Sequence, residues 1–475
     1  MRLAPLLIVT ALCFACRGDG DPTSPRGTPG IRFEAGDRIT DTIQAELTQA
    51  LVVEVRDAAG ALQPGVVVRF ESALLNPAPP GGGFGAFVSR LDQDFFTTLV
   101  ADTTDSRARA AVLVKLGTRA GTAELIVTVP ELGLVDTATY TVRPGAAIRI
   151  QAVPKDTTLR VGGNFTLRSA VIDRFGNSRS DAVTYATPGA GLALSGGAVT
   201  ATAPGRAFVL AQASGWVDTT FVSVVPEGML AAASPTGIVV FNTDGSDFRM
   251  LTTTVTRGFT TDWSPTGTEI AYDADFGQPI RAVNLNGQVR LASRGGGGTE
   301  LYPEYAPDGA MLFFSRESWR LFRVKVDGTG EELVPMSPAT SAAASSLSPD
   351  GSRLVYTIVA GGGQDVLGFL TLATGVAVNT QIRGHSPSWS PSGDQIAFID
   401  PSNGTLQLMR ADGTGIRTIG APNSAYSFGI DWSSDGKWIS ARNASKDLIE
   451  LIDPQTGSIL PLGYTHGLSG PSWKP

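Results

Sequence analysis

The sequence contains very little cysteine and histidine, and each shortage excludes a kind of site. Its two cysteines, Cys13 and Cys16, both lie at the extreme N-terminus of the 475-residue chain. Neither a disulfide framework nor a cysteine-ligated metal site can therefore hold the remainder together. The two histidines, His385 and His466, are fewer than a histidine-rich catalytic metal centre requires. The folded regions must be stabilised by packing alone.

Positive charge is also scarce relative to negative charge. The net charge is −7, which argues against nucleic acid or an anionic membrane surface as the main partner. Hydrophobic residues make up 42% of the chain and charged residues 17%, as expected for a folded protein. Short Val-, Thr- and Ile-rich segments alternate with Gly, Pro, Asp and Asn clusters, a pattern that predicts an all-β fold.

The N-terminus begins with Arg2 and an apolar run from Leu3 to Ala15, which is too short for a permanent membrane-spanning helix. Cys16 follows this run directly. The segment resembles a bacterial lipoprotein signal, which is cleaved before a cysteine that then carries lipid. This resemblance implies a signal peptide at 1–15, a lipid anchor on Cys16 and a membrane-attached location in the bacterial cell envelope, facing the periplasm or the exterior. Plain secretion is the alternative.

Residues 16–30 are rich in Gly and Pro, and we expect them to form a flexible tether. Two stretches of short strands separated by turns follow, at 31–145 and 146–227, and predict tandem β-sandwiches. Both resemble bacterial immunoglobulin-like domains of invasin-type surface proteins. The first carries D-x-x-G-x-x-x-P-G-V-x-V-x-F within 51–72, and the second carries VGGNFTL and GGAVTATAPGRA.

A stricter repeat fills residues 228–475. A large apolar residue recurs every 41 to 43 positions, a period typical of propeller blades. In most copies it precedes a turn such as SPTG, APDG, SPDG or SPSG, then an apolar strand, and later a second tight turn. Each unit is therefore predicted to have four strands, with the recurring residue in the innermost one. The six recurring residues, called anchors below, are Trp263, Tyr305, Leu347, Trp389, Trp432 and Trp473.

The repeat is similar to the WD40-like repeats of the periplasmic translocation protein TolB, and this resemblance implies a six-bladed propeller. Residues 229–252 supply three strands of one blade, and the terminal GPSWKP supplies only an innermost strand. We therefore predict that the C-terminal strand pairs with the first blade and closes the ring, which leaves no open sheet edge between the ends.

No catalytic motif was found in the sequence. It contains no G-x-S-x-G, H-E-x-x-H or Walker pattern, so we predict no catalytic residues, no cofactor and no metal ligands. Asp273 and Asp275 have the alternate spacing that could seed a Ca²⁺ site. Solvated loop carboxylates are the alternative interpretation.

The loops that vary between repeats are expected to share one face of the propeller, because the short, similar turns share the other. Loops on a rigid scaffold commonly carry binding residues. The variable loops contain the candidate binding residues Arg383, His385, Tyr426, Tyr464 and His466, together with Trp319. The favoured hypothesis is a non-enzymatic envelope lipoprotein that displays the propeller to a protein or glycan ligand. A propeller enzyme acting on surface glycans or peptides, and a TolB-like assembly or transport component, are the alternatives.

Overall fold

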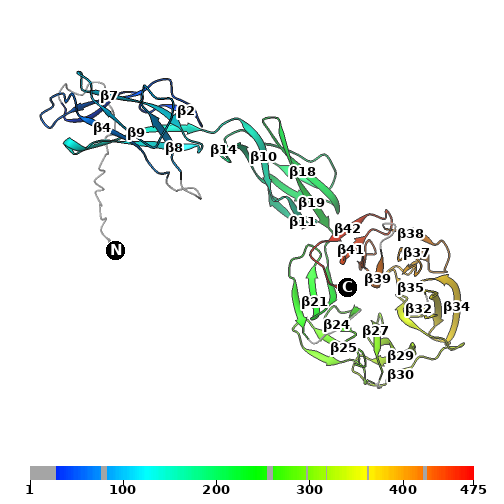
Figure 1. Cartoon of the computed structure of the whole chain (residues 1–475). Coiled ribbons are helices and arrows are strands. Elements are labelled where there is room, and N and C mark those ends of the chain that lie inside the picture. Colours follow the sequence, from blue (N-terminus) through cyan, green and yellow to red (C-terminus); the bar gives the residue numbers. More distant parts are fainter. Residues whose placement is uncertain are drawn as a thin grey trace, which may run out of the picture. The chain divides into compact units, whose positions relative to one another are not determined.

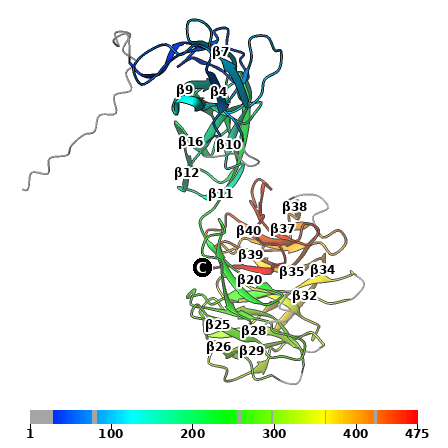
Figure 2. The same cartoon turned by 60° about the vertical axis from the view of Figure 1, so that its left-hand side comes forward.

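The computed structural model describes residues 28–75, 83–253, 260–295, 298–316, 318–360, 363–420 and 425–475. Within these ranges the regular structure is strand, apart from one 3-10 turn at Pro130–Leu132. Two views of the chain are given (Figures 1 and 2). The predicted signal peptide, Cys16 and most of the tether lie outside the described residues. In the part that is described, no helix is long and apolar enough to cross a membrane. The chain divides into two compact units, which are treated separately.

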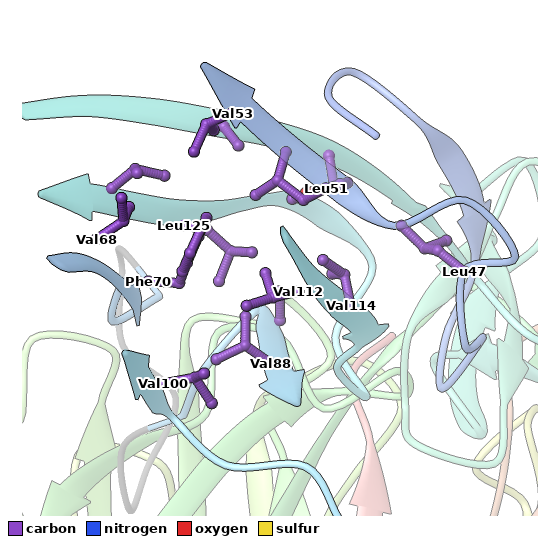
Figure 3. Close-up of a cluster of buried hydrophobic side chains, with 14 of the residues drawn as sticks. Leu47, Leu51, Val53, Val68, Phe70, Val88, Val100, Val112, Val114 and Leu125 are labelled. Carbon is purple, nitrogen blue, oxygen red and sulfur yellow. The ribbon is translucent and has the colours of Figure 1, made fainter. Parts of the chain in front are cut away.

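The N-terminal strands form two facing sheets around one apolar core. Strand β7 (Arg109–Leu116) shows why, because buried and half-buried residues alternate along its whole length, as they do in a strand with one face on a core. Leu51, Phe70, Val112 and Leu125 come from different strands and meet in this core (Figure 3). One sheet has the order β1 (Gly30–Ala35), β3 (Leu51–Arg56), β7 (Arg109–Leu116), β5 (Ala86–Ser89); the other has β2 (Thr40–Thr42), β9 (Leu134–Arg143), β8 (Gly121–Val129), β4 (Val67–Ser72), β6 (Leu99–Thr103).

Three smaller sheets follow, and the boundary between the two units runs through their strands. Among their strands, β11 (Asp156–Arg160) and β19 (Trp216–Val225) run parallel, with Asp156 opposite Phe221. The first sheet has the order β10 (Ala147–Val153), β13 (Arg168–Asp173), β14 (Ser178–Arg179). The second has β11 (Asp156–Arg160), β19 (Trp216–Val225), β18 (Gly205–Ala213), β15 (Thr184–Ala186), and the third has β12 (Asn164–Thr166), β17 (Ala198–Ala201), β16 (Leu192–Ser195).

Six four-stranded antiparallel sheets make up the C-terminal region, a β-propeller (Figure 1). They are called blades 1 to 6 here. Blade 1 contains β43 (Ser469–Trp473), β20 (Met229–Ser234), β21 (Gly237–Asn242) and β22 (Arg249–Thr252). Blade 2 has β23 (Thr261–Trp263), β24 (Glu269–Tyr272), β25 (Arg281–Asn284), β26 (Val289–Leu291); blade 3 has β27 (Glu300–Tyr305), β28 (Met311–Arg316), β29 (Arg320–Lys325), β30 (Glu332–Leu333).

The remaining blades repeat this order. Blade 4 has β31 (Ala343–Leu347), β32 (Arg353–Ile358), β33 (Val366–Thr371), β34 (Val376–Arg383); blade 5 has β35 (His385–Trp389), β36 (Gln395–Ile399), β37 (Leu406–Arg410), β38 (Arg417–Ile419); blade 6 has β39 (Tyr426–Trp432), β40 (Ile439–Asn443), β41 (Leu448–Ile452), β42 (Ile459–Leu462). The first strand named in each blade is its inner strand.

Every anchor occupies the end of an inner strand and is at most 5% exposed. The inner strands contact one another in succession from β23 through β27, β31, β35 and β39 to β43, and β43 also contacts β23. Packing of the anchors between neighbouring blades explains why the same residue type recurs at a fixed interval. The inner strands therefore surround a common centre, where the candidate site lies.

Candidate functional site

A cavity of about 90 Å³ lies at the centre of the propeller. Its wall is built from the residues that precede the anchors on the inner strands of blades 2 to 6, with Pro471 from blade 1. It is called the channel cavity here. These residues occupy the middle and the C-terminal part of the inner strands, directly before the anchors.

A repeated irregularity in the inner strands shapes this wall. The residue three positions before the anchor has a left-handed backbone, with φ of 57° at Tyr302, 42° at Ala344 and 49° at Ser386. Pairing with the second strand of each of these blades shifts register at the same place, which marks a β-bulge. A non-glycine residue in this conformation costs about 1–3 kcal/mol, and such strain is often stored at functional sites.

Blades 6 and 1 carry glycine at the equivalent position, Gly429 and Gly470. A Cβ atom on Gly429 would lie 2.4 Å from the Cα atom of Gly470. Since no side chain fits between these two backbones, the closest approach of blades 6 and 1 depends on glycine.

In blades 2, 3, 4 and 6 the side chain of the residue immediately before the anchor links its blade to the next one. Asp262 Oδ2 accepts a hydrogen bond from the Tyr305 backbone N–H at 2.6 Å, and Glu304 Oε1 accepts one from Leu347 N–H at 2.5 Å. In blade 4, Ser346 Oγ accepts from Trp389 N–H at 3.0 Å. In blade 6, Asp431 Oδ2 accepts from Trp473 N–H at 2.7 Å. These side chains line the cavity and also hold neighbouring blades together.

Three of these linking side chains are carboxyl groups with perturbed ionisation. Burial raises the pKa of Asp262 well above its usual range, and the Asp431 carboxyl nearby raises it further. Burial, followed by the charge of Asp262, likewise raises the pKa of Glu304. Burial raises the pKa of Asp431 to about 7, against the opposing effect of the Trp473 and Trp432 N–H groups. The narrow cavity leaves the three residues partly accessible but poorly hydrated.

Two polar atoms of the wall residues have no hydrogen-bond partner in the described part of the chain. They are Glu304 Oε2 and Ser345 Oγ, and both are shielded from bulk solvent. A shielded polar atom without a partner costs about 1–3 kcal/mol, so proteins rarely retain one without a reason. The inter-blade link uses Oε1 of Glu304, not Oε2.

An aromatic pair adjoins this wall. The ring of Tyr302, which lines the cavity, lies 6.4 Å from the ring of Trp319, measured between centroids. Trp319 comes from the loop between β28 and β29 and itself has a left-handed backbone, with φ of 59°. Its carbonyl oxygen accepts a hydrogen bond from Ala342 N–H at 2.5 Å, which fixes the loop against blade 4.

The predicted binding residues lie outside the channel cavity, because none of the five is among its lining residues. Arg383 is exposed and donates from Nη2 to Gln364 Oε1. His385 begins β35, and its Nδ1 lies 3.1 Å from Oγ of Ser386, a cavity residue. Burial lowers the pKa of His385. His466 is exposed.

The two predicted tyrosines are packing residues in this structure. Tyr426 is 4% exposed and donates from its hydroxyl to Glu450 Oε2 at 2.8 Å. Tyr464 donates to the Thr243 carbonyl at 2.7 Å and packs edge-on against Phe241. Of the five predicted binding residues, only Arg383 and His466 are exposed.

Sequence reasoning missed Asp262, Glu304 and Asp431, although a signal was present. The position before the anchor reads Asp, Glu, Ser, Ser, Asp and Ser from blade 2 round to blade 1. The repeat keeps the anchor but varies this position between charged and neutral residues. The position immediately before the anchor is therefore a place where the blades differ chemically.

The aspartates considered for Ca²⁺ have local roles. Both carboxylate oxygens of Asp273 accept hydrogen bonds from Thr260, at 3.0 and 3.2 Å, and Asp275 Oδ1 accepts one from Phe276 N–H at 2.7 Å. Across the described residues, no group of three or more His, Cys, Asp or Glu side chains is placed to hold a metal ion.

No protein-family model matches the chain. An uncharacterized protein of Agrobacterium fabrum is 26% identical over 214 residues, which is 38% of this chain and 72% of that protein. Similar solved structures include a putative TolB from Agrobacterium tumefaciens, with 17% identity, a TM-score of 0.42 and coverage of 50% of this chain and 88% of that one. TolB from Acinetobacter baumannii has 12% identity, a TM-score of 0.42 and coverage of 69% and 99%. An oligogalacturonate lyase in complex with manganese has 19% identity, a TM-score of 0.34 and coverage of 50% and 72%.

Proposed function

We propose that the chain is a non-enzymatic, envelope-anchored lipoprotein that presents its propeller as a protein- or glycan-binding module. The observation that carries this proposal is the channel cavity. Its wall combines partly accessible carboxyl groups, hydroxyl groups and an aromatic ring with polar atoms that lack partners. Convergent polar groups in a preformed concave site are the usual signature of ligand binding.

The proposed scaffold is a six-bladed ring closed by its last strand. β43 is hydrogen-bonded to β20 of blade 1, while Trp473 N–H is bonded to Asp431 of blade 6. This double attachment supports closure, because it ties the C-terminal strand to the blades on both sides. A closed ring is rigid, and rigidity lowers the entropy cost of binding at its centre.

The remaining parts of the proposal concern how the propeller is attached to the membrane. We assign the two sandwich regions, 31–145 and 146–227, to immunoglobulin-like domains and Cys16 to the lipid anchor. Short strands with turns between them, in paired sheets around an apolar core, support the first assignment. In this arrangement the sandwiches act as spacers between the membrane and the propeller.

An enzyme is the second candidate, because one observation favours it. Asp262, Glu304 and Asp431 are ionisable groups with raised pKa values that line one cavity, a combination common in active sites. A carboxylic acid with a pKa near 7 can donate a proton at neutral pH. Such an enzyme would act on surface glycans or peptides. A TolB-like role in envelope assembly or transport is a further form of the binding proposal.

Capture of ligands from envelope extract by the full mature chain tests the binding proposal. The test compares the wild type with a cavity variant, Asp262→Asn with Glu304→Gln, and with a control variant, Asp327→Ser with Asp412→Ser. The control aspartates lie in the tight turns and accept hydrogen bonds from Thr329 and Thr414.

A ligand retained by the wild type and the control variant, but lost from the cavity variant, would support the proposal. Its affinity is then measured with purified components. Equal retention by all three proteins would refute a role for the cavity in binding. Turnover of an envelope glycan or peptide by the wild type, abolished in the cavity variant, would establish the enzyme instead.

A further inference from the structure

The carboxyl groups of the channel cavity have no basic partners in the described part of the chain, in contrast to Glu300 and Glu450, two buried carboxylates of the same propeller. Glu300 is bonded at 2.7 Å to Nε of Arg316, and Glu450 is bonded at 2.7 Å to Nζ of Lys446. No ion pair is formed by Asp262, Glu304 or Asp431 within the described residues. A carboxylate shielded from water is normally paired with a cation, since an unpaired one is expensive.

The cavity wall itself supplies no counter-charge. Of its described lining residues, none is Lys, Arg or His. The three carboxyl groups come from blades 6, 2 and 3, and the equivalent positions of blades 4, 5 and 1 are serines. Blades 2 and 3 therefore carry adjacent carboxyl groups and blades 4 and 5 adjacent hydroxyl groups, while Ser472 of blade 1 separates the carboxyl group of blade 6 from that of blade 2. The arrangement offers hydrogen-bond acceptors at several separate points.

A second observation concerns two polar atoms of the wall residues. The shielded oxygen Glu304 Oε2 lacks a hydrogen-bond donor in the described part of the chain, and Ser345 Oγ, which is also shielded, has no hydrogen-bond partner there. Asp262 Oδ2, Glu304 Oε1 and Asp431 Oδ2 are used by the inter-blade links, and Asp431 Oδ1 accepts a hydrogen bond from Trp432 N–H. A hydrogen-bond donor on a ligand would satisfy either atom.

The aromatic pair indicates which kind of hydrogen-bond donor a ligand would bring to the cavity. Tyr302 forms part of the wall, and its ring is tilted by 31° relative to the ring of Trp319, with centroids 6.4 Å apart. Aromatic faces attract ammonium and guanidinium groups and also pack against the methylene stems of long basic side chains. A volume of about 90 Å³ holds a few water molecules or the end of one extended side chain, but not a compact domain.

From these features we infer that the channel cavity binds an organic cation, an ammonium or guanidinium group at the end of an extended chain, of the kind carried by Lys or Arg in a peptide. The carboxyl groups supply the counter-charge, Glu304 Oε2 and Ser345 Oγ accept hydrogen bonds, and Tyr302 with Trp319 flanks the stem. Donors spread over the cation match acceptors spread over the wall. This inference rests on the proposed binding function and names the chemistry of its ligand.

Titration calorimetry with the full mature chain tests the inference. The probe is the blocked peptide Gly-Gly-Lys-Gly-Gly, compared with its Arg and norleucine counterparts, with n-butylamine and with calcium chloride. Lys and Arg peptides should bind, and norleucine should bind at least about tenfold more weakly because it lacks the charge. If n-butylamine binds as tightly as the Lys peptide, the site recognises the ammonium group of a free amine and does not require a peptide.

Variants localise the binding. Glu304→Gln keeps an oxygen for the Leu347 link but removes the charge, and it should weaken Lys-peptide binding at least about tenfold with an unchanged thermal midpoint. Ser345→Ala removes an atom that holds no bond, so it provides a second test free of folding effects. Asp327→Asn, in an exposed tight turn, is the matched control and should bind normally.

Equal binding of the norleucine peptide, binding of Ca²⁺ alone, or unchanged affinity in both Glu304→Gln and Ser345→Ala would each overturn the inference. These failures are distinct from failure of the proposed function. Should the Lys and Arg peptides fail while the Asp262→Asn, Glu304→Gln variant still loses an envelope ligand, the propeller binds something other than an organic cation.

Discussion

Trp473 lies opposite Leu230 in the pairing of β43 with β20, so the last strand of the chain completes the sheet in which the propeller begins. Both side chains belong to the same apolar cluster, together with Trp438 and Leu468. The two ends of the propeller are thus held by one core as well as by hydrogen bonds. This contact makes the C-terminal residues a structural necessity.

Removal of this contact should destabilise the propeller. Trp473 is 5% exposed, and truncation of a buried tryptophan to alanine costs about 3–5 kcal/mol. Trp473→Ala should lower the thermal midpoint, and deletion of residues 469–475 should lower it further. Trp216→Ala is the matched control, because Trp216 is 44% exposed. An unchanged midpoint after the deletion would show that β43 does not stabilise the ring.

The close approach of Gly429 and Gly470 provides a second prediction. Gly429→Ala should destabilise the propeller, because the new Cβ atom would lie 2.4 Å from the Gly470 Cα atom in a left-handed conformation. Gly467→Ala isolates the conformational cost, since Gly467 has φ of 75° and no atom within 4 Å of the added Cβ. Denaturant unfolding should show a clearly larger loss for Gly429→Ala than for Gly467→Ala. Equal losses of unfolding free energy in the two variants would mean that blades 6 and 1 move apart around the new Cβ atom at no cost in stability.

The raised pKa of Asp431 predicts a pH dependence of stability. Its pKa of about 7 in the folded state exceeds the value of 3.8 for an unperturbed aspartate, so the folded state binds the proton more tightly. This contribution is complete below about pH 3.8 and is lost as pH rises through about 7. Each pKa unit corresponds to about 1.4 kcal/mol of unfolding free energy.

Asp431→Asn removes this titration. The free energy of unfolding, measured between pH 4 and pH 7.5 for both proteins, should therefore fall more steeply with pH in the wild type than in the variant. Parallel curves for the two proteins would show that Asp431 ionises normally. Asp412→Asn serves as control, because hydrogen bonds from Thr414 lower the pKa of that exposed carboxyl.

The proposed lipid anchor gives the fourth prediction. Cys16→Ala should move the protein from the membrane fraction to the soluble envelope fraction, because one residue carries the whole attachment. Cell fractionation followed by detection of the chain measures this directly. Cys13→Ala is the natural control and should leave the protein in the membrane fraction. Membrane retention of Cys16→Ala would contradict the lipoprotein assignment.

Much of the propeller could be predicted from the sequence, because its signal is repeated. Each anchor is placed by the same packing requirement, so a period of 41 to 43 residues and recurring turns predicted four-stranded units. The structure contains those units, and β43 joins β20 as the split of the first unit predicted. The predicted site residues were harder to place, because loop sequences indicate only which end of the propeller a residue occupies.

The sequence alone thus determined the strand order within blades, the identity of the anchors and the partner of the final strand, since these depend on periodicity and local turn chemistry. Only the tertiary structure decided which polar groups meet at the centre. Asp262, Glu304 and Asp431 lie far apart in the chain, and they line one cavity because blades 2, 3 and 6 point their inner strands toward it. Tyr426 and Tyr464 were turned inward by packing against Glu450 and Phe241, contacts that no local pattern specifies.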